Sequence, residues 1–249
     1  RRERPDMTRA LSWCDLAAVR VKKDLDGNLL HVASYCGHAA MVLLLLGKGV
    51  DKDKADKYGW TPLYVASYKG HLEVVRLLVD AGADKDKANN NGRTPSWIAS
   101  YKGHLEVVRL LVDAGADKDK ANNNGPTLLF MASEKGHLEI VRLLIDAGAD
   151  KDKAENDGRT PLYVASCKGH LEVVRLLIDA GADKDKADNG GWTPLYIASY
   201  KGHLEVVRLL VEAGADKDKV NQVGSTPLYV ASDYGHLEIV RLLVEKGAD

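Results

Sequence analysis

Residues 158–190 read GRTPLYVASCKGHLEVVRLLIDAGADKDKADNG, and this 33-residue stretch decides the fold because it recurs along most of the chain. Two residue types mark the period, each at intervals of 33: Gly59, Gly92, Gly125, Gly158, Gly191 and Gly224, and Ala66, Ala99, Ala132, Ala165, Ala198 and Ala231. A fixed period of about 20 to 50 residues is typical of solenoids built from stacked supersecondary units. The sequence therefore predicts a repeat protein.

Each copy predicts one helix, a turn and a second helix. Thr160 suits the N-cap of the first helix, helix A, and Pro161 fits its first position, where a missing N–H removes no hydrogen bond. Gly169 ends helix A. The second helix, helix B, is expected over 171–180 and stops before Gly181, because Gly favours the C-terminal cap.

Helix B has one apolar stripe that it cannot bury alone. Leu171, Val174 and Leu177 lie three residues apart on one side of the helix. Copies are therefore expected to stack, with the polar stretch 183–190 crossing to the next copy. Its last residues suit a tight turn.

The motifs Thr-Pro-Leu-Tyr-x-Ala, Gly-His-Leu-Glu-x-Val-x-Leu-Leu and Ala-Gly-Ala-Asp at this period resemble the ankyrin repeat over about 26–249. The resemblance implies an all-α solenoid with two antiparallel helices per repeat and a projecting β-turn finger between repeats. It also implies that the fingers and the exposed side of helix A form a concave groove for partner proteins. Seven repeats are expected, at about 26–58, 59–91, 92–124, 125–157, 158–190, 191–223 and 224–249.

The chain departs from the family pattern at several points. The His that follows Thr-Pro-Leu in the family is kept only at His31, and aromatic residues take its place later: Tyr64, Trp97, Phe130, Tyr163, Tyr196 and Tyr229. Ser96 replaces a core Leu, and Pro126 lies one place early, so these two neighbouring copies are expected to be a local weak point.

The two ends of the repeat array are expected to differ. Residues 1–25 contain a degenerate N-terminal capping repeat, with Lys22 and Lys23 where internal copies have apolar residues. At the other end, 237–248 repeats the internal pattern without polar substitution. That end is expected to expose an apolar face, which favours docking of further protein mass.

The finger base reads Asp-Lys-Asp-Lys-Ala at 84–88 and recurs with little change. Its alternating charges sum to zero. A solvated, self-paired ridge is the simpler interpretation, and a charged strip facing a partner is the alternative.

Overall charge and composition restrict the possible partners. Lys and Arg total 35 and Asp and Glu total 36, so the net charge is −1. A dedicated nucleic-acid binder needs a basic excess, which argues against nucleic acid. Tyr-Lys pairs such as Tyr68-Lys69 and Tyr101-Lys102 leave that alternative open locally.

Cysteine usage and hydropathy give a weaker indication of compartment. Cys14, Cys36 and Cys167 have neither metal-ligand nor disulfide spacing, so reduced thiols are expected. This favours the cytoplasm or another reducing intracellular compartment. Purely apolar stretches such as 41–46 are too short to span a bilayer.

Catalysis is not expected. The repeated histidines, His38, His71, His104, His137, His170, His203 and His236, are spread too evenly to hold one metal ion, and hydrogen bonding at the helix start is the simpler interpretation. Nucleotide-binding and hydrolase motifs are absent from the sequence. We therefore expect neither enzyme activity nor a cofactor.

Candidate binding residues are those that vary between otherwise similar copies. They lie at the end of helix A and next to the finger Gly, where Trp60 and Trp192 are expected as exposed tips. The set combines aromatic and basic types, which dominate binding hot spots. It comprises Trp60, Tyr68, Lys69, Arg93, Tyr101, Lys102, Arg159, Lys168, Trp192, Tyr200, Lys201 and Tyr234.

The sequence therefore predicts a protein-binding scaffold, monomeric on its own, that holds a partner in the concave face. One alternative is a structural linker docked into a larger assembly through its C-terminal end. Another is the targeting module of a longer enzyme.

Overall fold

The computed structural model describes residues 29–249, which form two compact units divided between Ala116 and Asp117. The expected capping repeat in 1–25 lies outside these residues. Every regular element between 29 and 249 is an α-helix, and no strand occurs there. The prediction of an all-α solenoid of paired helices is confirmed.

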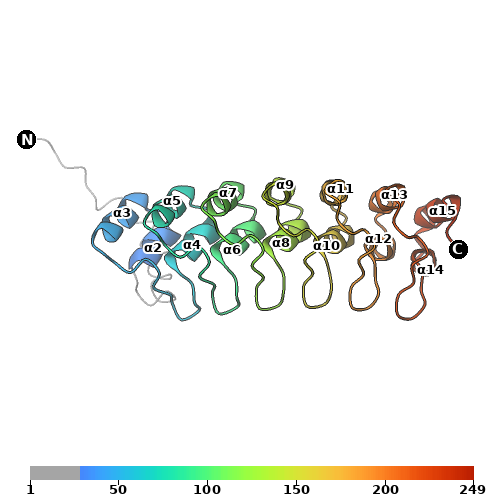
Figure 1. The fold of residues 1–249 in the computed structure, drawn as a ribbon, viewed down its shortest axis with the longest axis horizontal. Helices are drawn as coiled ribbons and strands as arrows, with labels where there is room; N and C mark the ends of the chain where they lie inside the picture. Colours follow the sequence, from blue (N-terminus) through green and yellow to red (C-terminus); the bar gives the residue numbers. More distant parts are fainter. Residues whose placement is uncertain (1–28) are drawn as a thin grey trace, which may run out of the picture. The chain divides into compact units, whose positions relative to one another are not determined.

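The first unit contains three helix pairs. Helices A and B alternate as α2 (Leu29–Tyr35), α3 (Ala39–Gly47), α4 (Pro62–Lys69), α5 (Leu72–Asp80), α6 (Pro95–Lys102) and α7 (Leu105–Asp113). Helices α2, α4 and α6 pack side by side in one row, and α3, α5 and α7 pack in a second. The fingers project from the helix A row (Figure 1).

The second unit repeats this arrangement with four helix pairs. They are α8 (Leu128–Lys135), α9 (Leu138–Asp146), α10 (Pro161–Lys168), α11 (Leu171–Asp179), α12 (Pro194–Lys201), α13 (Leu204–Glu212), α14 (Pro227–Asp233) and α15 (Leu237–Glu245). Again the even-numbered helices form one row and the odd-numbered helices the other (Figure 1).

The boundaries of the helices follow from the capping residues. The Oγ1 atom of Thr160 accepts a hydrogen bond from the backbone N–H of Tyr163 at 3.1 Å, as expected of an N-cap. Gly169 ends α10 with φ of 73°, in the left-handed region. Helix B of the same repeat spans Leu171–Asp179, one residue shorter than the sequence pattern indicated.

The core lies between the two helix rows of each unit. Within the repeat at 158–190, Leu162, Ala165, Val174 and Leu177 are fully buried. Outside this stripe, the Nε atom of Arg175 lies 3.7 Å from a carboxylate oxygen of Glu172. Apolar burial on one side and charge on the other stabilise the stacked arrangement.

The repeated histidines join each repeat to the preceding one. The Nε2 atom of His71 lies 2.9 Å from the carbonyl oxygen of Tyr35, and His203 makes the same contact with Cys167 at 3.0 Å. A carbonyl only accepts, so Nε2 donates. The side chain of His71 makes no capping bond at the start of its own helix. The expected bond at the helix start is therefore wrong, because the ring reaches 36 residues back along the chain.

This histidine contact also requires the Gly at the end of the preceding helix A. A Cβ on Gly70 would lie 2.6 Å from the Nδ1 atom of His104, well inside van der Waals contact. Gly70 has φ of 75° as well. The residue both ends α4 and makes room for the ring of the following repeat.

The charged finger bases connect neighbouring repeats through backbone groups. Asp53 Oδ1 accepts from the N–H of Asp84 at 2.8 Å, and Lys87 Nζ donates to the carbonyl oxygen of Asp53 at 2.7 Å. The second unit repeats this pair of bonds: the N–H of Asp183 donates to Asp152 Oδ1, and Lys186 Nζ donates to the carbonyl oxygen of Asp152. The expected self-paired ridge is thus mainly a side-chain-to-backbone clamp between repeats.

The two irregular copies keep a filled core. Ser96 is fully buried beside Trp97, which is 3% exposed, and the Ser96 hydroxyl has no hydrogen-bond partner among residues 29–249. In the next copy Leu128 takes the Pro position, and Thr127 still caps the helix through the N–H of Phe130. The weak point expected at these copies stays a prediction.

Candidate protein-binding face

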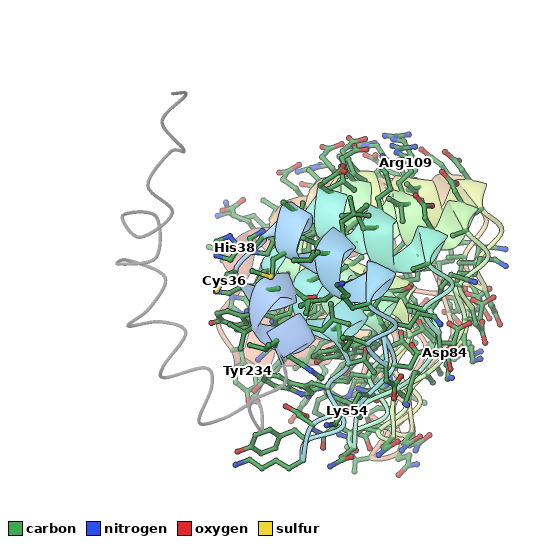
Figure 2. All side chains as sticks on the ribbon, turned by 90° about the vertical axis from the view of Figure 1, so that its left-hand side faces the viewer. Cys36, His38, Lys54, Asp84, Arg109 and Tyr234 are labelled. Atoms are coloured by element: carbon green, nitrogen blue, oxygen red, sulfur yellow. The ribbon has the colours of Figure 1, made fainter. Side chains whose placement is uncertain are left out.

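The variable residues of each unit lie in the finger turns and in the last turn of each helix A. We call the surface that these segments form within one unit the finger face. Figure 2 places Cys36, which occupies the position of Lys69 one repeat earlier, on the opposite side of the first unit from Asp84. The end of helix A therefore lies on the opposite side of this unit from the charged clamp at Asp84.

The finger tips are β-turns that end at a Gly of positive φ. In the first finger, the N–H of Gly59 donates to the carbonyl oxygen of Asp56, so Lys57 and Tyr58 occupy the tip. Asp56 Oδ1 accepts from the N–H groups of Tyr58 and Trp60 and holds the turn closed. Trp60 therefore follows the tip and closes the turn.

Trp60 is half-buried, which corrects the expectation of an exposed aromatic tip. Its ring stacks on Tyr64 and Tyr68 with centroid distances of 5.6 and 6.3 Å, and its carbonyl oxygen accepts from His31. Trp192 is half-buried in the same way, against Tyr196 and Tyr200. Both tryptophans join a finger to its own helix A.

In the first unit, ring and cation contacts run without a break from finger to helix. Trp60 contacts Tyr68, and Lys102 Nζ lies 4.6 Å from the centre of the Tyr68 ring and 5.6 Å from that of Tyr101. Tyr101 stacks on Trp97 at 5.7 Å, and Arg93 lies 4.6 Å from the Trp97 ring.

Lys69 lies outside this chain of contacts, with its Nζ 4.3 Å from the Tyr35 ring. The structure thus brings five of the six candidates in this unit together: Trp60, Tyr68, Arg93, Tyr101 and Lys102.

In the second unit, the candidates form a smaller cluster. Tyr200 lies between Trp192 at 6.2 Å and Tyr234 at 4.5 Å, and Lys201 Nζ lies 4.7 Å from its ring. Lys168 is exposed and, among the described residues, makes no ion pair or ring contact. Like Lys69 in the first unit, it lies apart from the other candidates.

An open cavity of about 510 Å³ lies between fingers of the second unit. Its lining combines aromatic, amide and charged groups from Arg159, Asp188, Gly190, Trp192, Tyr196, Asn221, Gln222 and Val223. Val223, at a finger tip, is 82% exposed. The cavity can take one apolar side chain of a partner against the Trp192 ring.

Two of the residues that replace the family His are buried tyrosines with raised pKa values. Burial raises the pKa of Tyr64 to about 12, with Arg93 opposing the shift. Burial and a hydrogen bond to Asp188, in the next finger, raise the pKa of Tyr163 above its ordinary value. The Tyr163 hydroxyl therefore contacts the next finger, as the imidazole of His31 does at the carbonyl oxygen of Trp60.

Sequence reasoning missed the true tip residues. Tyr58 and Val223 are exposed at 47% and 82%, and each lies just before the finger Gly. The signal that could have identified them is this Gly, because a positive φ at the end of a four-residue turn places the two preceding residues at its tip.

The described residues show neither a metal centre nor a membrane span. No group of three His, Cys, Asp or Glu side chains between 29 and 249 is placed to hold a metal ion. Within the same range, every helix is too short or too polar to cross a bilayer.

Comparisons with known proteins agree with this architecture. The family model described as ankyrin repeats (3 copies) matches residues 5–89, 30–122, 114–188 and 182–249. No curated protein matches the chain. The ankyrin repeat domain of Bcl-3, a member of the IkappaB protein family, is similar in structure: its TM-score is 0.78 at 33% identity, covering 86% of this chain and 98% of that one. The chain belongs to the ankyrin repeat family, whose repeats generally mediate protein–protein interactions.

Proposed function

We propose that the chain is a non-catalytic scaffold that binds a partner protein through the finger face. The observation that carries this proposal is a division of roles between constant and variable positions. Constant residues cap helices, fill the core or clamp repeats, whereas most of the variable aromatic and basic residues contact one another within the finger face of their unit. A repeated fold needs only the first group, so the second is available for recognition.

The finger face has the chemistry of a binding hot spot. Aromatic rings and Arg bring a large contact area with polar groups at the edge. Here the rings are already stacked, as with Trp60 on Tyr64 and Trp97 on Tyr101. A partner would therefore meet side chains held in place before binding, which lowers the entropic cost of association.

Site-specific photo-crosslinking can test the assignment of the face. A photoreactive phenylalanine analogue would replace one exposed Lys at the end of helix A, at Lys69, Lys102, Lys168 or Lys201. We expect the analogue at each of these positions to crosslink to the same partner protein in cells of the organism from which the chain comes.

Exposed Arg residues of helix B in the same repeats give matched controls. The analogue at Arg76, Arg109, Arg175 or Arg208 should yield little crosslinking, because these side chains lie on the helix B side (Figure 2 shows Arg109). Stronger crosslinking from the Arg positions would contradict the proposal.

A second candidate is docking through the C-terminal helix pair. Tyr229 is 61% exposed, whereas Tyr196 at the same position of the preceding repeat is 6% exposed. Leu237 and Val244 are also more than half exposed. Such a surface is typical of a face that packs against further protein mass.

Charged substitutions on the C-terminal helix pair distinguish the two candidate functions. Leu237→Glu and Val244→Lys should abolish incorporation into an assembly and leave crosslinking from Lys102 intact if end docking is a separate function. Unchanged complex size with these variants would exclude end docking.

A further inference from the structure

We propose that the finger face of the first unit binds an acidic segment of the partner protein, with Arg93 and Lys102 as its principal cation contacts. This inference rests on the proposed function and specifies the chemistry of the partner. It comes from comparing cations that occupy the same repeat position in the two units.

Arg93 and Arg159 occupy the same position but differ in their surroundings. Arg159 pairs with Asp157 at 2.7 Å and lies 3.4 Å from Glu155. The corresponding residues beside Arg93 are the neutral Asn91 and Asn89. Within the described residues Arg93 makes no ion pair, its Nε lacks a hydrogen-bond partner, and its guanidinium lies over the Trp97 ring.

Lys102 and Lys135 differ in the same way. Lys135 Nζ lies 3.7 Å from a carboxylate oxygen of Glu134, the residue before it. The residue before Lys102 is Tyr101, and the cation lies over two tyrosine rings. A ring attracts a cation through its quadrupole but carries no net charge, so the positive charge of Lys102 stays uncompensated.

The remaining charges of this face have the same sign. Lys57 and Lys69 are exposed and also lie against tyrosine rings. The one acidic side chain in the first finger turn, Asp56, is buried and accepts two backbone N–H groups. The finger face of the first unit therefore carries four cations, whereas its one carboxylate is buried. An anionic partner has the complementary charge.

An acidic peptide fits this surface better than a single-stranded nucleic acid. Base stacking needs open aromatic faces. Here Lys102 covers the Tyr68 ring, and Trp97 is 3% exposed.

Selection from a random displayed library of 12-residue peptides, with the full chain as bait, tests the inference. We expect selected peptides to be enriched in Asp and Glu. Their binding, measured by fluorescence anisotropy, should weaken at least about tenfold for the double variant Arg93→Gln and Lys102→Gln. It should also weaken between 50 and 200 mM salt, because salt screens exposed charges.

Exposed cations on the helix B side of the same unit supply a matched control. The double variant Arg76→Gln and Arg109→Gln removes the same net charge away from the finger face, and peptide affinity should change less than about threefold. A gain-of-pairing variant, Asn91→Asp, places a carboxylate where Asp157 pairs with Arg159. It should weaken binding several-fold with Arg93 intact.

Other outcomes separate this inference from the proposed function. Selected peptides without acidic enrichment, but sensitive to Tyr68→Ala, would overturn the acidic partner and leave the binding face in place. A different outcome is that a 20-nucleotide oligo-dT binds more tightly than the peptides, with the same dependence on Arg93 and Lys102. That outcome would show that the partner of this face is a nucleic acid and not an acidic peptide. Failure to select any peptide counts against both proposals.

Discussion

The Nε2 atom of His71 donates a hydrogen bond to the carbonyl oxygen of Tyr35, 36 residues earlier in the chain, at 2.9 Å. This contact satisfies a carbonyl at the end of one helix A, where the helix itself offers no donor. It also orients helix B of the next repeat. His71 precedes the first residue of helix B, but its side chain makes a hydrogen bond between repeats and not a helix cap.

We expect His71→Ala to lower the free energy of unfolding by about 1 to 3 kcal/mol, because it leaves a partly buried carbonyl without its donor. Urea unfolding followed by circular dichroism measures the change. The matched variant His38→Ala removes an exposed ring and should change stability by less than about 0.5 kcal/mol. Equal effects of the two variants would show that the inter-repeat bond contributes nothing.

The Asp-Lys clamp predicts a stability difference between two substitutions at one position. Asp53→Ala removes the acceptor for the N–H of Asp84 and should destabilise the protein by about 1 kcal/mol. Asp53→Asn keeps a side-chain oxygen there and should retain most of the stability. Thermal melts of the two variants suffice. If Asn is as damaging as Ala, the clamp depends on charge rather than on the hydrogen bond.

Alkaline pH should destabilise the fold through Tyr64. Its folded-state pKa of about 12 exceeds the ordinary value of 10, so the neutral phenol favours the folded state. That contribution is complete below pH 10 and is lost as the pH rises toward 12. Between pH 9 and 11.5 the wild type should lose up to about 2 kcal/mol more than Tyr64→Phe in urea unfolding.

Tyr229→Phe, at the same repeat position but with a ring that is 61% exposed, controls for the loss of a phenol hydroxyl as such. Parallel profiles for the wild type and Tyr64→Phe would contradict the role of burial.

Ser96→Ala should stabilise the protein. The Ser96 hydroxyl is fully buried and has no hydrogen-bond partner in the described part of the chain, so removing it eliminates a desolvation cost of about 1 kcal/mol. Calorimetry should show a higher melting temperature. Ser232→Ala, which removes an exposed hydroxyl bonded to Leu228, is the comparison and should give no gain. A lower melting temperature for Ser96→Ala would show that the hydroxyl has a favourable contact.

Much of the fold could be predicted from the sequence because its signals are local. Thr160 caps α10 through an N–H three residues away, and Gly169 ends the same helix. The spacing of Val174 and Leu177 identified the buried side of α11. These features depend on neighbours within one or two helical turns, which the pattern displays directly.

The candidate site was predicted less well because its contacts cross between elements. The sequence identified the variable positions, but it placed Trp60 and Trp192 at exposed tips, where the structure has Tyr58 and Val223. Stacking of Trp60 on Tyr68 depends on how the finger folds back on α4. No local periodicity encodes that geometry.

The sequence by itself determined the 33-residue unit, its two helices and the residues that vary between copies. Tertiary structure alone decided that His71 bonds to Tyr35, that Asp53 and Lys87 clamp adjacent fingers, and that Arg93 lies on a ring without the carboxylates that Arg159 has. The physical reason is distance along the chain. Caps and stripes form within a few residues, whereas clamps and the charge of a binding face arise only when repeats about 33 residues apart stack against one another.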